Sequence, residues 1–263
     1  MKITILCENG TALPSLSFEH GLSLHIQRKD DALLFDMGQS GAFADNAKAL
    51  GVDLAKVDAA FLSHGHYDHG GGLGRFLEEN GHAPVYMAKD AFGAHFSGKE
   101  RYIGLDPALK GEKRIAFCSE AVRPLKDATF FPAPSSALPD TFDGRMLKKE
   151  GNAFLTDGFS HERCLLLEED GRRILIGGCC HKGVLSLLEA CPADYFIGGF
   201  HFMKVETDSP KGRALLEKAA KKMLETKTLF FTGHCTGEEQ FAFLKERMGD
   251  RLLRIRTGDV IEI

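Results

Sequence analysis

The stretch Ser63-His64-Gly65-His66-Tyr67-Asp68-His69-Gly70-Gly71-Gly72 contains three histidines and one aspartate within six consecutive residues. Neutral imidazole is a common protein ligand of zinc-like ions, and ligands two residues apart can converge on one ion from a tight turn. The preceding run, Ala59-Ala60-Phe61-Leu62, is typical of a buried strand that ends at these residues. The alternative is a solvated, histidine-rich surface loop, and the strand in front of it favours a metal site.

Composition sets the broad class of the protein. The chain has 263 residues, 43% of them hydrophobic, which is enough for a sizeable core, and we expect one compact domain over 1–263. A net charge of −4 predicts no binding of nucleic acid. No apolar run is long enough for a signal peptide or a membrane span, so we expect no membrane association. Seven cysteines without a framework spacing indicate reduced thiols and a cytoplasmic location.

Hydrophobic periodicity predicts alternating strands and helices. The predicted strands are 2–7, 22–27, 32–36, 59–62, 85–87, 164–168, 173–176, 193–197, 228–231, 252–255 and 260–263, and the predicted helices are 43–50, 71–80, 184–188, 214–224 and 238–248. The segment around 93–113 has no sustained period and is interpreted as an irregular insertion, and the proline-rich segment 131–139 is interpreted as a loop.

Some residues in these segments are candidates for substrate contact. Lys99, Arg101 and Tyr102 could contact a substrate, although a solvated surface loop explains them equally well. The helix start at 70–72 would favour an anion, because free N–H groups point out of a helix N-terminus. Asp36 ends a predicted strand, where capping of the next turn is the expected role and a hydrogen bond to a ligand histidine is the alternative.

Four predicted strands end in glycine-rich turns that carry a histidine. These histidines are His64, His181, His201 and His234. In layered α/β folds, ligands bind at the carboxyl ends of the strands. Any one of the four could be a packing residue, but four at the same topological position indicate convergence on one site.

The HxHxDH pattern of residues 64–69 resembles the signature of the metallo-β-lactamase superfamily. The order of strands and helices is similar to the αββα sandwich of that superfamily, so the resemblance implies an α/β fold with four layers. Further segments resemble the branch named for dihydropterin ribofuranosylaminobenzene-phosphate synthase, namely 36–41, 63–73, 178–181, 199–201 and 232–237.

The resemblance implies two divalent metal ions, zinc first, with iron or manganese as alternatives. His64 and His66 would bind the first ion, with His181 completing its site. Asp68 and His69 would bind the second ion, together with His234.

One departure from the superfamily pattern concerns the bridging ligand. Typical members carry a bridging aspartate at about the position of Cys179, and this chain has none there. Cys179, Cys180 or His181 could substitute, which would favour softer metals. His161 is an alternative ligand of the first site, ranked below His181. His201 is expected to line the pocket as an acid, base or substrate donor.

These expectations give three hypotheses for function. The first is a hydrolase that uses a metal-bound hydroxide on an ester, phosphoester or similar small molecule, with Asp68 and His201 as catalytic residues. The second is a transferase resembling the synthase of the branch, acting on an anionic substrate that Lys99, Arg101 or Lys204 could bind. The third is a non-catalytic metal or redox sensor, suggested by Cys179, Cys180 and Cys235. Diiron chemistry is disfavoured, because His66 stands where flavodiiron proteins carry glutamate. The sequence does not indicate an oligomeric state.

Overall fold

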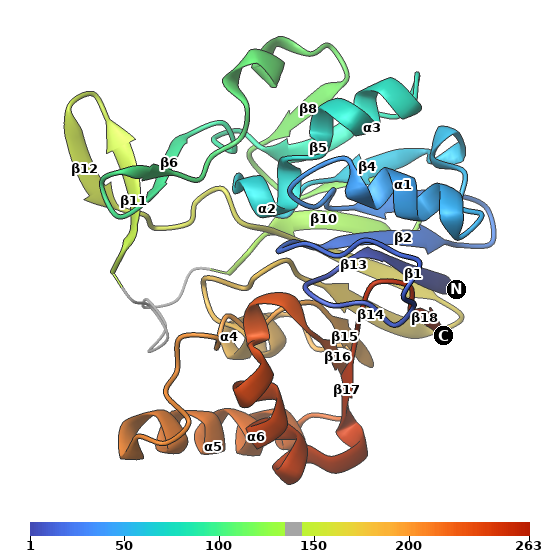
Figure 1. Ribbon diagram of the computed structural model, residues 1–263. Coiled ribbons are helices and arrows are strands. Elements are labelled where there is room, and N and C mark those ends of the chain that lie inside the picture. The colour runs from blue at the N-terminus through green and yellow to red at the C-terminus, as the bar shows by residue number, and fades with distance from the viewer. Residues whose placement is uncertain (135–143) are drawn as a thin grey trace.

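A computed structural model describes residues 1–134 and 144–263 of the chain. Two seven-stranded sheets pack face to face, and helices cover their outer faces (Figure 1). The first sheet has the order β18 (Val260–Glu262), β1 (Lys2–Cys7), β2 (Ser23–Gln27), β3 (Ala32–Phe35), β4 (Ala59–Phe61), β5 (Val85–Ala88) and β8 (Ile115–Cys118). The second has the order β17 (Leu252–Arg254), β16 (Leu229–Thr232), β15 (Tyr195–Ile197), β14 (Arg172–Ile176), β13 (Arg163–Glu169), β10 (Ala128–Pro132) and β9 (Val122–Leu125).

The central strands are apolar on both faces because each sheet lies between two layers. In β13, Leu165 and Leu167 pack in the core between the sheets, whereas Cys164 and Leu166 pack under the helices. This alternation follows from the two-residue period of a strand. Strands that are buried on both faces appear in the sequence as continuous hydrophobic runs. This is why the hydrophobic pattern located them in the sequence.

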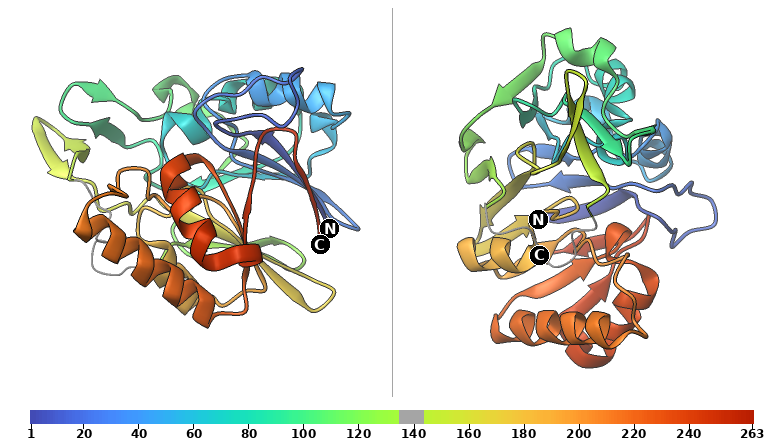
Figure 2. Two further views of the ribbon diagram at one scale, coloured as in Figure 1. Left: turned by 60° about the horizontal axis from the view of Figure 1, so that its bottom comes forward. Right: turned by 90° about the vertical axis from the view of Figure 1, so that its left-hand side faces the viewer.

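The helices complete the outer layers. Helices α1 (Ala42–Ala49) and α3 (Leu73–Glu79) cover the first sheet, and α4 (Val184–Ala190), α5 (Pro210–Glu225) and α6 (Glu238–Met248) cover the second (Figures 1 and 2). A one-turn helix, α2 (Tyr67–Gly70), and four 3-10 turns, η1 (Leu54–Lys56), η2 (Pro107–Gly111), η3 (His234–Thr236) and η4 (Gly249–Arg251), lie in the connections. The predicted four-layer αββα sandwich is confirmed.

A third, smaller sheet projects from the sandwich in both figures. Its order is β12 (Ala153–Thr156), β11 (Met146–Glu150), β6 (Ala94–Ser97) and β7 (Arg101–Tyr102). The segment around 93–113, expected to be irregular, therefore contains two strands and the turn η2. Strand β7 pairs with its neighbour β6, and β6 pairs with β11 some 50 positions later, as His95 does with Lys148. Local periodicity does not report such long-range pairing.

Two other expectations need correction. Phe131 and Pro132 belong to β10 rather than to a loop, because they pair with β13; positions 135–139 of the expected loop lie outside the described residues. The helix expected over 71–80 is α3, which begins two residues later than expected, at Leu73, and a separate one-turn helix, α2, ends at Gly70 before it.

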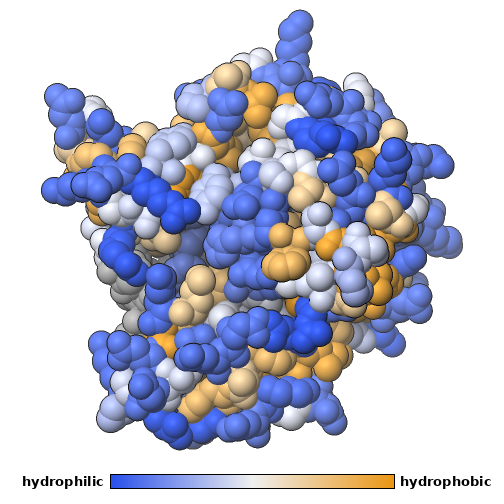
Figure 3. Space-filling model, in the orientation of Figure 1, coloured by the Kyte–Doolittle hydropathy of each residue, from blue (hydrophilic) through white to orange (hydrophobic). Residues whose placement is uncertain are grey.

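The face of the molecule in Figure 3 is largely hydrophilic, and its apolar residues lie in small separate groups. Across the described ranges, no helix is both long and apolar enough to cross a lipid bilayer.

A buried histidine in β2 gives the first testable prediction. His25 is 7% exposed, and burial, with Lys2 nearby, lowers its pKa to about 4. Its unfolded pKa is about 6.5, so the unfolded chain binds the extra proton as pH falls from about 6.5 to 4, and stability is lost there. When the pH falls from 7 to 4.5, the unfolding free energy of the parent chain should drop by about 2 kcal/mol more than that of His25→Phe. Urea denaturation at the two pH values measures both changes. The exposed histidine variant His82→Phe should follow the parent curve, and parallel curves for all three proteins would refute the prediction.

Candidate metal centre

The histidine-rich stretch lies where β4 ends and α2 begins. His64 and His66 occupy the turn, and Asp68 and His69 lie on α2; all four side chains are buried. Candidate ligand atoms of His64, His66 and Asp68 lie within 4.8 Å of one another. The local turn therefore supplies several ligand atoms to one place, as the sequence predicts.

A second group of ligand atoms joins the two halves of the chain. One atom each from Asp68, His69, Cys179 and His234 lies within 4.8 Å of the others. His69 Nε2 is 3.1 Å from His234 Nε2 and 3.2 Å from Cys179 Sγ. Ligands at about 2.0–2.3 Å from a tetrahedral ion lie roughly 3.3–3.6 Å apart. The side chains present thus fit a zinc-like ion.

The site proposed for the first ion is built around His64. Its Nε2 atom is 3.2 Å from Nε2 of His181, and ligand atoms of His64, Cys179 and His181 lie within 4.8 Å of one another. The rings of His64, His66 and His181 are 4.5–5.0 Å apart and almost perpendicular to each other. This is an arrangement that three imidazoles could keep around a single ion. The assignment of these three ligands stays a prediction.

Hydrogen bonds behind three of the histidines direct Nε2 into the site. His69 Nδ1 donates to Asp36 at 2.7 Å, His234 Nδ1 lies 2.8 Å from Asn9 Oδ1, and His64 Nδ1 lies 2.8 Å from Ser63 Oγ. An acceptor on Nδ1 fixes the ring and leaves the Nε2 lone pair for a metal.

Asp36 acts through His69 and does not cap the next turn. Its carboxylate also accepts from the amide and hydroxyl of Ser63, both at 2.7 Å, and α1 has no side-chain cap. The expected capping role is therefore wrong, because both carboxylate oxygens are committed to Ser63 and His69. The alternative, a hydrogen bond to a predicted ligand histidine, is what the structure contains.

Cys179 belongs to two groups of metal-capable atoms, the one with His69 and His234 and the one with His64 and His181, whereas Cys180 belongs to none among the described residues. The Cys180 side chain is buried among apolar residues between β14 and the helices, and burial raises the pKa of its thiol well above the ordinary value. Of the residues considered for the place of the bridging aspartate, Cys179 is the one that lies within reach of both predicted ion positions.

Charge in the site concentrates on two neighbouring groups. Burial acts to raise the pKa of Asp68, but His69, His20 and His234 outweigh it and hold this pKa well below its usual range. Burial acts to lower the pKa of His69, and Asp36 and Asp68 raise it to about 9. For His64, burial is the main cause of a pKa well below the ordinary value. Without an ion, a proton on His69 offsets the charge of the carboxylates, and metal binding would displace it.

Several supporting residues were not predicted from the sequence. Glu162 accepts from the amides of His181 at 2.6 Å and Lys182 at 2.9 Å, and so fixes the loop after β14. Glu8 accepts from the amide of His234. His20 Nε2 lies 3.3 Å from Asp68. These residues come from loops far away in the sequence, and they match no motif.

The loops that carry the site contain an unusual backbone conformation. Asp36, Cys180, His201 and His234 have φ between 49° and 58°, although none is glycine. Left-handed backbone is costly for such residues and is concentrated at functional sites. It turns the chain sharply just after β3, β14, β15 and β16, and so brings the side chains at these strand ends together.

Two of the predicted histidines, His201 and His161, lie beside the site and join neither of the groups that contain Cys179. The His201 ring is 4.3 Å from His181, and among the described residues it belongs to no group of metal-capable atoms. His161 Nδ1 accepts from the Gly65 amide at 2.9 Å, and its Nε2 is 3.3 Å from Asp157. Both nitrogens of His161 are thus engaged, which leaves His181 as the better placed of the two for the first ion.

The expectation that the Gly70–Gly72 helix start binds an anion is wrong. The amides of Gly70, Gly71 and Gly72 already donate to the carbonyls of His66, Tyr67 and Gly38. A Cβ on Gly71 or Gly72 would come within 2.2 Å of a backbone oxygen, so these glycines serve close chain packing.

Of the basic candidates, Arg101 borders the site. Its guanidinium donates to the Tyr67 hydroxyl at 2.7 Å, whereas Lys99 and Lys204 are exposed on loops. The Tyr102 hydroxyl is engaged with Leu105 O.

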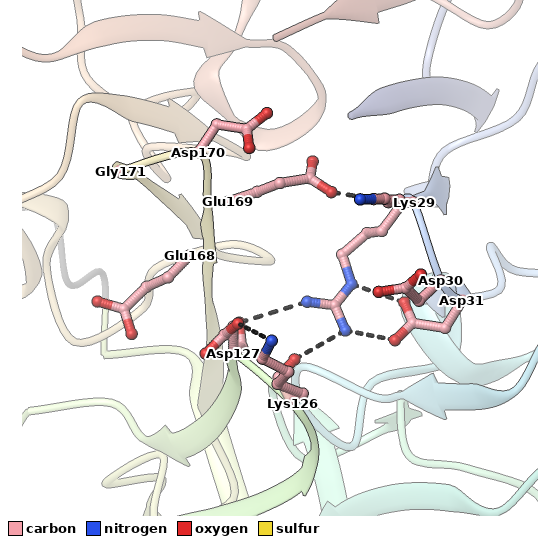
Figure 4. Close-up of a pocket in the computed structure, with 10 residues that line it drawn as sticks. Lys29, Asp30, Asp31, Lys126, Asp127, Glu168, Glu169, Asp170 and Gly171 are labelled. Atoms are coloured by element: carbon pink, nitrogen blue, oxygen red, sulfur yellow. Dashed lines mark hydrogen bonds and ion pairs between the residues drawn. The ribbon is translucent and has the colours of Figure 1, made fainter.

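A separate pocket lies at the opposite ends of the strands (Figure 4). This cavity of about 430 Å³ is lined by the turns before β3, β10 and β14, whereas the histidines follow the other ends of such strands. Its central cation, Arg28, is paired with Asp31 at 2.5 Å and donates to Lys126 O at 2.9 Å. Arg28 is thus held by groups of the pocket itself, and no histidine or cysteine of the described ranges lines this cavity.

The position of Cys179 gives a second testable prediction. A thiolate binds soft and borderline metals strongly, so Cys179→Ser should weaken binding of the second ion by at least about tenfold. In the cobalt-substituted protein, the sulfur-to-cobalt charge-transfer absorption should disappear. Cys191→Ser is the matched control, since Cys191 lies beside Arg173 and away from the histidines. An unchanged cobalt spectrum in Cys179→Ser would contradict a ligand role.

Comparison with known proteins agrees with this geometry. The chain is similar to 7,8-dihydropterin-6-methyl-4-(beta-D-ribofuranosyl)-aminobenzene-5'-phosphate synthase of Methanocaldococcus jannaschii, with 24% identity over 93% of this chain and 90% of the relative. It is 30% identical to the uncharacterized protein MJ0448 of the same organism, over 77% and 80% of the two chains.

Solved structures share the fold. The crystal structure of Tm1679, described as a metal-dependent hydrolase of the beta-lactamase superfamily, has a TM-score of 0.83 and 27% identity and covers 100% of this chain and 99% of its own. Zn²⁺-bound PqqB from Methylobacterium extorquens, 12% identical, has a TM-score of 0.58 over the whole of both chains, which shows the fold alone.

The family model for the metallo-beta-lactamase superfamily matches residues 17–234. That range includes the HxHxDH pattern and extends to His234, and the predicted resemblance is confirmed. The chain belongs to the metallo-β-lactamase superfamily.

Proposed function

We propose that this protein is a metal-dependent hydrolase acting on an ester, phosphoester or similar small molecule. The observation that carries the proposal is the convergence of Asp68, His69, Cys179 and His234 beside His64 and His181. Two adjacent donor sets of histidine, carboxylate and thiol suit two divalent ions, with zinc first because it accepts all three ligand types.

A divalent ion held by these residues would lower the pKa of a bound water from about 15.7 to about 7 and so supply hydroxide at neutral pH. The residues supply orientation and proton transfer. Asp68 is ionised and 8% exposed, so it can orient the attacking water and accept its proton. His20, 3.3 Å from Asp68 and part-exposed, is placed to carry a proton from it towards solvent.

The substrate would enter beside His201 and Arg101. His201 is half-buried next to His181, where an imidazole can donate a hydrogen bond to the oxygen that gains charge. Arg101 lies over Tyr67, one residue before Asp68, and supplies a positive charge at this border. An anionic group on the substrate fits this position.

The test is turnover by metal-replete protein on a panel of carboxylic esters, lactones, phosphomonoesters and phosphodiesters. We expect at least one class to be cleaved, with activity lost in His64→Ala and in chelator-treated protein. The exposed-histidine variant His82→Ala should keep full activity. Two bound ions without cleavage of any member of the panel would refute the proposal.

A transferase is the second candidate, favoured by the similarity to the Methanocaldococcus jannaschii synthase over most of both chains. Incubation with a dihydropterin diphosphate and a ribofuranosylaminobenzene phosphate would test it. A coupled product found by mass spectrometry would support this function over hydrolysis, and no coupled product would remove it.

The sensor hypothesis has less support from the site. All seven cysteines are buried, and burial raises the pKa of the Cys179 thiol well above its ordinary value. Redox-sensing cysteines are accessible and have a low pKa, so the structure favours a role of Cys179 as a metal ligand.

A further inference from the structure

A second group of polar side chains lies behind the predicted ligand His66. It consists of His66, His95 on β6, and Asp157 and His161 on the loop after β12. All four side chains are at most 3% exposed, and one candidate ligand atom from each lies within 4.8 Å of the others. Only His66 belongs to the signature stretch, and the role of the other three in the site has not yet been explained.

The hydrogen bonds of Asp157 fix the protons of its neighbours. Its Oδ2 atom lies 2.7 Å from His95 Nδ1 and 3.3 Å from His161 Nε2, and Oδ1 accepts from the Phe159 amide at 2.8 Å. His161 Nδ1 accepts from the Gly65 amide, so the ring proton of His161 is on Nε2 and points to Asp157. Since a carboxylate only accepts, His95 must likewise carry its proton on Nδ1.

Two buried ring nitrogens of this group remain without a hydrogen bond to any described residue. His95 Nε2 and His66 Nε2 are buried and have no hydrogen-bond partner among the described residues. With Nδ1 protonated, His95 Nε2 presents a bare lone pair. The two rings are 5.6 Å apart, centre to centre, in an edge-on arrangement. A neutral imidazole that binds an ion through Nδ1 carries its proton on Nε2, so His66 could supply the donor that His95 lacks.

We propose that His95 and Asp157 are positioning residues for His66: when His66 binds an ion through Nδ1, its Nε2–H bonds to the unpartnered Nε2 of His95, which Asp157 in turn holds through Nδ1. The result is a carboxylate–imidazole–imidazole chain that ends on a ligand of the first ion. Such a chain fixes the rotation of the His66 ring and makes its Nδ1 atom a stronger metal ligand, as carboxylate–histidine pairs do in metal sites. The inference rests on the metal centre and is independent of the reaction that the protein catalyses.

Charge supports a permanent anion at the end of this chain. Burial acts to raise the pKa of Asp157, but hydrogen bonds from His161 and His95 outweigh it and hold the pKa well below its usual range. Burial also lowers the pKa of His161, which therefore stays neutral. On this side His66 faces one carboxylate and two imidazoles, and the carboxylate of Asp157 supplies the charge that can polarise it.

An ion of its own in this cluster is the competing explanation. Of the six imidazole nitrogens, His66 Nε2 and His95 Nε2 are the two that are buried without a hydrogen-bond partner among the described residues, and Asp157 Oδ2 already accepts from two rings. A structural zinc site uses four ligand atoms, so an ion here would have to break the Asp157 hydrogen bonds. The hydrogen bonds of Asp157 and the unpartnered Nε2 atoms of His66 and His95 therefore favour the proposed chain, and the number of bound ions distinguishes the two explanations.

The test compares metal binding by the parent protein, His95→Phe and His95→Gln. We expect His95→Phe to weaken the first ion by about 10- to 100-fold, measured by chelator competition, while the protein still binds two ions. His95→Gln should recover much of the affinity, because its amide oxygen can accept the His66 proton. His25→Phe, which removes a buried histidine elsewhere, should leave both affinities unchanged.

A spectroscopic readout separates positioning from simple loss of packing. In the zinc-loaded parent protein, nitrogen-15 NMR should show a slowly exchanging Nε2 proton on His66, and His95→Phe should abolish that signal. Equal affinities in the parent and both His95 variants would overturn the proposal. Three ions in the parent and two in His95→Phe would also overturn it and assign the cluster to an ion of its own. Neither outcome depends on turnover, so a failure of this inference is distinct from a failure of the proposed hydrolase.

Discussion

Replacing Asp68 with asparagine is expected to lower kcat by about 10²- to 10⁴-fold, the range that general acid–base catalysis contributes. Asparagine keeps the shape of the side chain but cannot accept a proton from water. The pKa of Asp68 is held well below its usual range, so the aspartate is ionised and able to act as a base at neutral pH. The measurement is kcat at saturating substrate, using the substrate identified by the hydrolysis panel.

The Asp68 experiment must separate chemistry from metal loss. Asp68 belongs to two of the groups that could hold an ion, so kcat should be measured at saturating zinc with the bound metal counted in parallel. Asp30→Asn is the control, because Asp30 is exposed and lines the pocket at the opposite ends of the strands. Asp68→Asn with two ions and full kcat would exclude Asp68 as the base.

Removal of metal is expected to lower the melting temperature by roughly 10 °C. An ion present at about 1,000 times its Kd stabilises the folded state by about 4 kcal/mol, and each kcal/mol corresponds to about 2–4 °C for a chain of this size. Without an ion, His69 Nε2 lies buried 3.1 Å from His234 Nε2 and 3.2 Å from Cys179 Sγ. Few hydrogen-bonding protons are available to these three polar atoms. Thermal unfolding of chelator-treated and zinc-loaded protein, followed by circular dichroism, measures the difference.

Two controls make the stability experiment specific. Adding zinc back should restore the melting temperature, and calcium should not, because imidazole and thiolate ligands do not suit a hard cation. In His234→Ala, zinc should stabilise much less than in the parent protein. Identical melting curves for the metal-free and metal-loaded parent would contradict a tightly held ion.

The sandwich and the main ligand positions could be predicted from the sequence for a physical reason. Strands buried on both faces must be apolar, and an ion needs histidine or carboxylate groups at the strand ends. These two requirements explain the apolar stretches that precede His64 and His181 in the sequence. The resemblance to a known superfamily then supplied the grouping of ligands, which spacing alone left open.

The rest depends on contacts between distant segments. The pairing of β6 with β11 and the bond of Asp157 to His95 join residues tens of positions apart. Gly71 and Gly72 look suited to an anion in the sequence, yet they are required because Gln39 and Met37 pass close to them. Asp36 was ambiguous for the same reason, since only the folded chain brings it to His69.

The residues predicted to hold the second ion follow strands of both sheets, which would couple metal binding to folding. Asp68 and His69 follow β4 of the first sheet, while Cys179 and His234 follow β14 and β16 of the second. His69 and His234 are 165 positions apart. A cross-link that closes a loop of this length removes unfolded-chain entropy on the order of 5 kcal/mol. In a chain whose seven cysteines are all free, a bound ion would act as the reversible counterpart of a disulfide between the two sheets.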